Sequence, residues 1–160
     1  MSRVFKTIEG IEVDEVEYTK RILELHPDAK VYVGSDSQRR ARSIKYAVSI
    51  VYRYDHKGCH IIYSEWYQKK ERKKKEDQRY SLIEKRLIEE ITTTIAVADD
   101  LRSNGIEVYQ IDFDLNEDPK WESHKIVQWA VGWAKGVGYR VSIKPDEQVA
   151  SRAANNIVNG

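Results

Sequence analysis

The order of strand-like and helix-like segments is the feature that most limits what this chain can fold into. Five segments have the alternating or β-branched pattern of strands, at residues 31–36, 45–54, 59–67, 106–114 and 139–143. Three later segments have apolar residues at helical spacing and begin near residues 81, 123 and 147. The chain therefore runs as three strands followed by helix, strand, helix, strand and helix.

This order predicts a mixed sheet. Residues 55–58 have the composition of a hairpin turn, which makes the strands on either side of them antiparallel. Strands that are separated by a helix usually cross over and run parallel. We therefore expect an α/β fold with a five-stranded mixed sheet, three antiparallel strands followed by strand–helix alternation, and helices on both faces. The first and fourth strands should be parallel neighbours.

Length and composition favour a single globular unit. The chain has 160 residues, of which 41% are hydrophobic, so we expect one domain over 1–160, with a core at about 30–158 and a helical N-terminal extension at 1–29. The single cysteine, Cys59, excludes an internal disulfide. No apolar run approaches the roughly 20 residues that a membrane-spanning helix needs. These features predict a soluble cytoplasmic protein, and the net charge of +1 by itself favours no partner.

Acidic residues stand at unusual places in this pattern. Asp36 ends a strand that is otherwise apolar, where an unpaired carboxylate is costly to bury. Glu90 lies on the same stripe of its helix as Leu87 and should face inward. In the fourth strand, period-2 alternation puts Asp112 and Asp114 on one face. Each position is easier to explain if the carboxylate has a partner.

These carboxylates are expected to converge. If the first and fourth strands are parallel neighbours, Asp36 and Asp114 end side by side, and the intervening helix can bring Glu90 to the same place. Three such groups repel one another unless a divalent cation neutralises them, and all-oxygen sites suit Mg²⁺ or Mn²⁺. Such a cluster can catalyse two-metal hydrolysis of phosphodiesters. The alternative is that Asp36 caps a helix while the other two are solvated carboxylates.

Several short motifs occur in the order found in a known family. They are VGSDSQ at 33–38, RLIEE at 86–90, DLN at 114–116, PKWESHK at 119–125, KGVGY at 135–139, KP at 144–145 and AS at 150–151. Through them, about residues 30–156 resemble the YkuK-like family of bacterial predicted ribonuclease H-related nucleases. The resemblance implies a ribonuclease H-like fold, a metal-dependent nuclease activity and acidic metal ligands at Asp36, Glu90 and Asp114.

One position departs from the family pattern. Where the resemblance leads us to expect an aspartate in the last helix, this chain has Asn155, which can ligate a metal through its carbonyl but adds no charge. Asn155 also points away from the apolar face that contains Ala150 and Ala153, whereas Asn156 lies closer to that face. The fourth ligand position is therefore open between the two asparagines. The alternative function is a catalytically weak or inactive module that binds nucleic acid or a protein.

Basic and aromatic residues complete the expectations. The nucleic-acid partner could be RNA, an RNA–DNA hybrid or DNA, and four lysines are candidates for contacting its phosphates: Lys73, Lys74, Lys125 and Lys144. Two of these lie in the charged run 69–75, which could equally be a solvated loop. Trp129 and Trp133 are four residues apart on a predicted helix, and we expect both in the core.

Overall fold

The computed structural model describes residues 3–54, 58–70, 82–116, 124–144 and 149–159. Within these ranges the chain forms seven strands and four helices. The strands are β1 (Phe5–Thr7), β2 (Glu12–Val13), β3 (Lys30–Arg39), β4 (Ser43–Arg53), β5 (Cys59–Lys69), β6 (Gln110–Asn116) and β7 (Val141–Lys144). The helices are α1 (Glu15–Leu25), α2 (Leu82–Ser103), α3 (His124–Gly136) and α4 (Val149–Val158).

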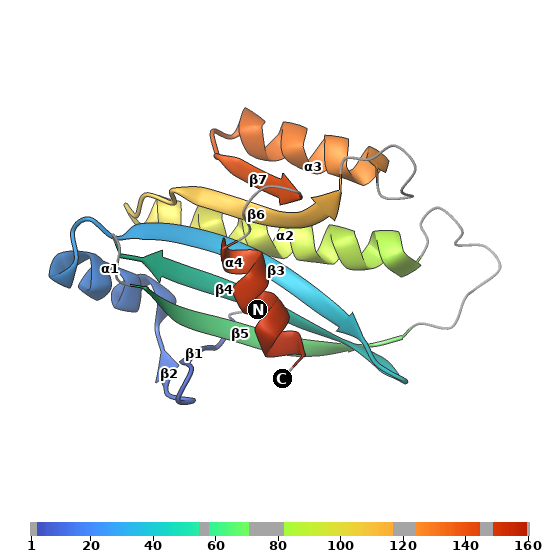
Figure 1. Ribbon diagram of the computed structural model, residues 1–160, viewed down its shortest axis with the longest axis horizontal. Helices are drawn as coiled ribbons and strands as arrows, with labels where there is room; N and C mark the ends of the chain where they lie inside the picture. Colours follow the sequence, from blue (N-terminus) through green and yellow to red (C-terminus); the bar gives the residue numbers. More distant parts are fainter. Residues whose placement is uncertain (1–2, 55–57, 71–81, 117–123, 145–148, 160) are drawn as a thin grey trace.

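All seven strands form one mixed sheet in the order β2-β1-β5-β4-β3-β6-β7 (Figure 1). The long strands β3, β4 and β5 are antiparallel neighbours. β6 then runs parallel to β3 on one side and parallel to β7 on the other. The predicted mixed α/β sheet is confirmed, and so is the prediction that the strands carrying Asp36 and Asp114 are parallel neighbours.

The sheet has seven strands rather than the five expected from the sequence. The two additional strands, β1 and β2, are three and two residues long, which is too short to show an alternating pattern. They extend the sheet beyond β5, where Lys6 pairs with Tyr63. The first 29 residues therefore contain two strands as well as the expected helix, α1.

Helices cover both faces of the sheet, as expected (Figure 1). The larger core lies between the sheet and the three helices α1, α2 and α3, and Val33, Ile50 and Ile91 are among its fully buried members. Two smaller apolar clusters lie under α4, which packs alone on the opposite face through Ala150 and Ala154. None of the helices in the described ranges is long and apolar enough to cross a membrane.

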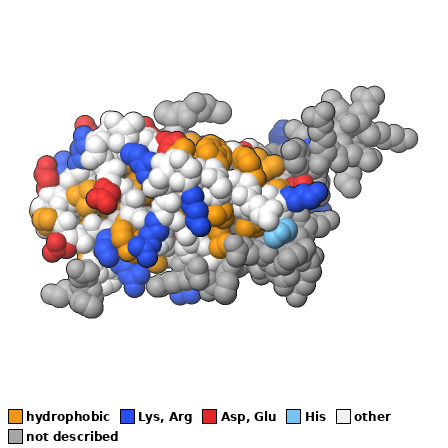
Figure 2. Space-filling model, turned by 90° about the horizontal axis from the view of Figure 1, so that it is seen from above, with side chains coloured by type: hydrophobic (Ala, Val, Ile, Leu, Met, Phe, Trp, Pro, Cys, Tyr) orange, Lys and Arg blue, Asp and Glu red, His pale blue; other side chains and the backbone are white. Residues whose placement is uncertain are grey.

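The expectation that Trp129 and Trp133 lie in the core is wrong. Their side chains are 46% and 37% exposed, and their rings pack on each other with centroids 5.4 Å apart. The buried face of α3 is formed instead by smaller side chains, namely Ile126, Val127, Ala130 and Ala134. Figure 2, which shows the molecule from the α3 side, has hydrophobic side chains on this surface. The helical spacing of the tryptophans marks a second apolar stripe rather than the one that meets the sheet.

Candidate functional site

The parallel pairing of β3 and β6 brings two aspartates side by side. Gly34 pairs with Asp112, so Asp36 and Asp114, two residues farther along each strand, extend from the same face of the sheet. Asp36 is only 7% exposed, and Asp114 is half-buried. The negative charge of Asp114 contributes to a raised pKa of Asp36, although burial contributes more. The two carboxyl groups therefore interact.

Glu90 reaches the same place from α2. The helix packs against β3, where the hydroxyls of Ser35 and Thr94 are 2.7 Å apart. One helical turn before Thr94, Glu90 is 8% exposed, and its Oε2 accepts a hydrogen bond of 3.1 Å from the Ser37 hydroxyl. A small pocket between α2 and β6 is lined by Glu90 and Asp114 among others. The helix thus supplies the third carboxyl group, as expected from its inward-facing position in the sequence.

The electrostatics of this cluster favour loss of charge. Burial raises the pKa of Glu90 well above its ordinary value of 4.5, and the charges of Asp36 and Asp114 raise it further. Burial is also the main cause of the raised pKa of Asp36. Hydrogen bonds to Asp36 from Asn155 and from the Ser37 backbone lower this pKa and partly offset the effect of burial. Carboxyl groups with raised pKa values gain most from a nearby cation, because a cation favours their ionised form.

Asn155, and not Asn156, faces this cluster. The Asn155 side chain donates a hydrogen bond from Nδ2 to Oδ2 of Asp36 over 2.7 Å. Asn155 points away from Ala150 and Ala153, as expected, and this direction places its amide beside the end of β3. Both Asn155 and Asn156 are exposed. Of the two asparagines left open by the sequence, Asn155 is therefore the one that contacts an expected ligand residue, and its role toward a metal stays a prediction.

The position of α4 depends on a very close contact with the sheet. Asp112, which is fully buried, accepts a hydrogen bond of 2.6 Å from the backbone N–H of Ala150 in the first turn of α4. The Ser49 hydroxyl donates to the Ala150 carbonyl at 2.7 Å. At Gly34, a Cβ atom would lie 2.7 Å from the backbone nitrogen of Ser151, so only glycine fits there without a shift. These contacts fix the helix that presents Asn155, a role of Asp112 that the sequence did not reveal.

An arginine on α2 and a serine on β3 form hydrogen bonds that hold Glu90 in the cluster. Arg86 lies one turn before Glu90 on α2 and donates from Nε to the Ser37 hydroxyl at 3.1 Å. Its Nη2 donates to the Ser37 backbone carbonyl at 3.0 Å. The same hydroxyl donates to Glu90, so Arg86 orients Ser37 and Ser37 orients Glu90. Sequence reasoning did not identify either residue, although the spacing of four between Arg86 and Glu90 places them on one helix face.

Comparison with known proteins identifies the family. A family model described as Ribonuclease H-like matches residues 16–159, which is nearly the whole chain. The chain belongs to the ribonuclease H-like family. The narrower YkuK-like resemblance is not confirmed by this match, and no curated protein matches the chain. Membership of the ribonuclease H-like family agrees with the mixed sheet and indicates a function related to nucleases and nucleic acids, in a family that typically uses divalent metals.

The donor set of this candidate site suits a hard divalent cation. Three carboxyl groups and one amide carbonyl are the ligands that Mg²⁺ and Mn²⁺ prefer. In the part of the chain that the structure describes, no three Asp, Glu, His or Cys side chains are arranged as a formed metal site. Instead, Asn155 donates a hydrogen bond to Asp36, and Ser37 donates one to Glu90. Rotating the Asn155 amide would turn its carbonyl, in place of its N–H, toward the cluster.

Of the four lysines expected to contact substrate, only Lys125 has a described side chain. Lys125 is exposed in the first turn of α3, and Lys144 is the last residue of β7, with a side chain outside the described part of the chain. Lys73 and Lys74 lie outside the described residues altogether. All four remain predictions of the sequence.

Proposed function

We propose that this protein is a metal-dependent nuclease that hydrolyses phosphodiester bonds of nucleic acid by a ribonuclease H-like two-metal mechanism. Asp36, Glu90 and Asp114 hold Mg²⁺ or Mn²⁺, and Asn155 contributes its side-chain carbonyl. The observation that carries the proposal is the meeting of two buried carboxyl groups, Asp36 and Glu90, beside Asp114 in a ribonuclease H-like chain. A buried acidic cluster of this kind is difficult to explain as a device for stability alone.

The chemistry assigns distinct tasks to the protein's own residues. Divalent cations, when bound, would lower the pKa of the attacking water and stabilise charge on the phosphate and the leaving oxygen. Asp36 and Asp114 extend from adjacent strands and fix the position of such ions relative to the sheet. Glu90, held by Ser37 and Arg86, gives the site a carboxylate of defined orientation. Preorganised ligands reduce the reorganisation needed when substrate binds.

A second function is favoured by one specific observation. Asn155 donates to Asp36, so this contact satisfies a carboxylate oxygen without adding the negative charge that an aspartate would supply. A site with one charge fewer holds its second cation more weakly, which supports a catalytically weak or inactive module that binds nucleic acid or a protein partner. Slow cleavage that is faster in Mn²⁺ than in Mg²⁺ is the expected behaviour of the enzyme, because Mg²⁺ demands near-ideal octahedral geometry.

The decisive experiment is a cleavage assay on the full chain. Labelled single-stranded RNA, RNA–DNA hybrid, duplex DNA and a branched DNA junction are incubated with Mg²⁺, Mn²⁺ or EDTA. We expect one class to be cut with either metal and none with EDTA, with loss of cleavage in Asp36→Asn and in Asp114→Asn. Glu24→Gln, which removes a carboxyl group from the exposed side of α1, is the matched control. Cleavage that persists in both aspartate variants contradicts the site, and binding without any cleavage supports the binding module.

A further inference from the structure

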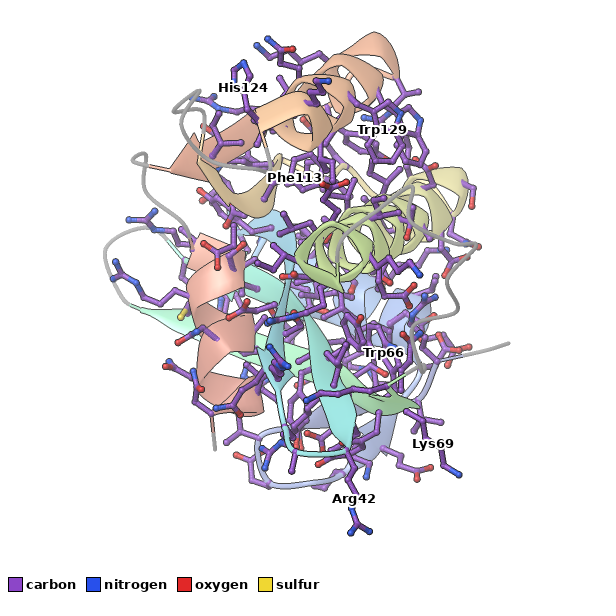
Figure 3. All side chains as sticks on the ribbon, turned by 90° about the vertical axis from the view of Figure 1, so that its right-hand side faces the viewer. Arg42, Trp66, Lys69, Phe113, His124 and Trp129 are labelled. Atoms are coloured by element: carbon purple, nitrogen blue, oxygen red, sulfur yellow. The ribbon has the colours of Figure 1, made fainter. Side chains whose placement is uncertain are left out.

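Basic side chains gather at the free end of the longest strands. β3 and β4 continue as a hairpin whose turn is closed by a hydrogen bond from Arg40 N–H to the Ser43 carbonyl, and β5 ends beside it, with Lys69 paired with Ser43. Figure 1 shows this end extending beyond α4. We call it the basic tip, and it consists of Arg39, Arg40, Arg42, Lys69 and Lys70. In Figure 3, which views the molecule from this side, Arg42 and Lys69 point away from the protein.

The basic tip has little internal compensation of charge. The one ion pair among the described residues joins Lys45 to Glu65 and lies farther back on the sheet. Arg40 and Lys70 donate to backbone carbonyls, of Val158 and Ala41 respectively. Arg39, Arg42 and Lys69 are exposed and form no ion pair with a described residue. Several cations gathered at one end of the sheet create a local positive potential that attracts a polyanion.

The tip is continuous with the acidic cluster. Partial desolvation lowers the pKa of Lys70, and the positive charges of Arg39 and Arg86 lower it further, so these three groups are close enough to repel. Arg86 in turn holds Ser37, which contacts Glu90. Positive charge therefore extends from the hairpin turn to the edge of the carboxyl groups. A surface built only for solubility would not need to concentrate like charges beside the site.

We propose that the basic tip binds the sugar–phosphate backbone of the nucleic acid on one side of the acidic cluster and so positions the scissile phosphate. The inference rests on the proposed function and deepens it. Arg39 lies three residues beyond Asp36 on β3, or about 10 Å at about 3.3 Å per residue. On a duplex with a rise of about 3.4 Å per base pair, that separation corresponds to about three base pairs. The tip therefore contacts phosphates outside the reacting one.

The test measures binding separately from cleavage. Fluorescence anisotropy in EDTA follows binding of the full chain to a labelled 20-base-pair RNA–DNA hybrid and to a labelled 20-nucleotide RNA over a range of salt concentrations. The tip variant combines Arg39→Gln, Arg42→Gln and Lys69→Gln. The control variant combines Lys20→Gln, Arg21→Gln and Lys135→Gln, which removes the same charge from exposed positions on α1 and α3. Circular dichroism verifies the fold, and the double variant Arg42→Gln/Lys69→Gln replaces the triple one if Arg39 proves necessary for folding.

We expect the tip variant to bind at least tenfold more weakly at low salt. Its slope of log affinity against log salt should decrease by about two units, because each lost phosphate contact removes about 0.7–0.9 of a unit. The control variant should keep the slope of the unmodified protein. An unchanged slope in the tip variant, or an equal loss in both variants, overturns the proposal. So does tip-dependent binding to vesicles that contain phosphatidylglycerol with no binding to either nucleic acid.

These outcomes also separate the inference from the proposed function. If the unmodified protein cleaves a substrate while the tip variant keeps its salt slope, the nuclease stands and the anchoring surface is wrong. If the tip variant loses affinity although no metal supports cleavage, the anchoring surface stands and the nuclease is wrong.

Discussion

Asn155 donates a hydrogen bond to Asp36 over 2.7 Å and thereby joins α4 to the strand that carries the first acidic residue. Asn155 is an uncharged side chain, and it reaches the cluster from α4, on the face of the sheet opposite α2. It lowers the pKa of Asp36, against the effect of burial. We therefore expect this pair of residues to influence whether the protein acts as the proposed enzyme or as an inactive binding module.

Replacing Asn155 with aspartate should shift that balance toward the enzyme. In Asn155→Asp a second carboxylate faces Asp36 at hydrogen-bonding distance, so the metal-free protein should melt at a lower temperature. Added Mg²⁺ should raise the melting temperature more than in the unmodified protein, through binding linkage. The Mg²⁺-supported cleavage rate should rise by about tenfold, an effect of the size seen when residues around a metal are altered. Differential scanning fluorimetry and the cleavage assay measure the two effects.

Asn156→Asp provides the matched control, because it adds the same charge one residue away on an exposed part of α4. It should change neither the metal-induced shift nor the rate. If Asn156→Asp has the larger effect on both, the assignment of Asn155 to the site is wrong.

Glu90 should make the metal-free protein sensitive to pH. Its pKa in the folded state is raised well above 4.5, so ionisation is less favourable in the folded chain than in the unfolded one. The free energy of unfolding should therefore fall as pH rises from about 4.5 through the folded-state pKa. Glu90→Gln keeps an acceptor for the Ser37 hydroxyl but cannot ionise, so the part of this loss that comes from Glu90 should disappear. Urea unfolding in EDTA at pH 5 and pH 8 measures the difference.

The comparison requires a variant that loses a carboxyl group elsewhere, and Glu24→Gln on α1 serves for this. The stability gained by Glu90→Gln relative to Glu24→Gln should be larger at pH 8 than at pH 5, and Mg²⁺ should reduce it. A gain that is the same at both pH values would show that Glu90 is not held in a charge-disfavouring environment.

Gly34 should be essential for the docking of α4. In Gly34→Ala the new Cβ would lie 2.7 Å from the Ser151 nitrogen, and backbone must move to accommodate it. Overpacking of this kind typically costs about 1–3 kcal/mol. Because the shift moves α4, cleavage should fall as well. Denaturant unfolding and the nuclease assay test both consequences.

Gly132→Ala is the contrasting substitution, since a Cβ there meets nothing within 4 Å and the residue lies inside α3. Alanine is the better helix former by about 1 kcal/mol, so this variant should be slightly more stable. Equal destabilisation by the two substitutions would mean that the close approach at Gly34 has no energetic importance.

The sequence predicted the central part of the fold because its elements are long and regular. The apolar run of β3, the alternation in β4 and the helix-separated strand β6 led to the prediction that β3 and β6 are parallel neighbours. That topology in turn brings Asp36 beside Asp114. The stripe containing Leu87 correctly turned Glu90 inward, since a 22-residue helix fixes its own faces.

The remainder depends on tertiary contacts that local patterns do not contain. β1 pairs with the edge of β5 and β2 pairs with β1, so both short strands depend on pairing with distant parts of the chain or with each other. Trp129 and Trp133 are exposed because smaller residues of α3 meet the sheet. The role of Asp112 depends on the approach of α4 from 38 residues farther along the chain. The contact between Asn155 and Asp36 spans 119 residues, so helical periodicity gave its direction but not its destination.

The most direct test of the central claim is the binding of Mn²⁺ to the full chain, followed by isothermal titration calorimetry and by electron paramagnetic resonance of free Mn²⁺. The unmodified protein should bind at least one Mn²⁺ with a dissociation constant below about 1 mM, and Mg²⁺ should compete. Asp36→Asn, Glu90→Gln and Asp114→Asn should each weaken binding at least tenfold, whereas Glu24→Gln should have no effect. Equal binding in all five proteins, or none in any, would contradict the assignment of a metal centre to these three carboxyl groups.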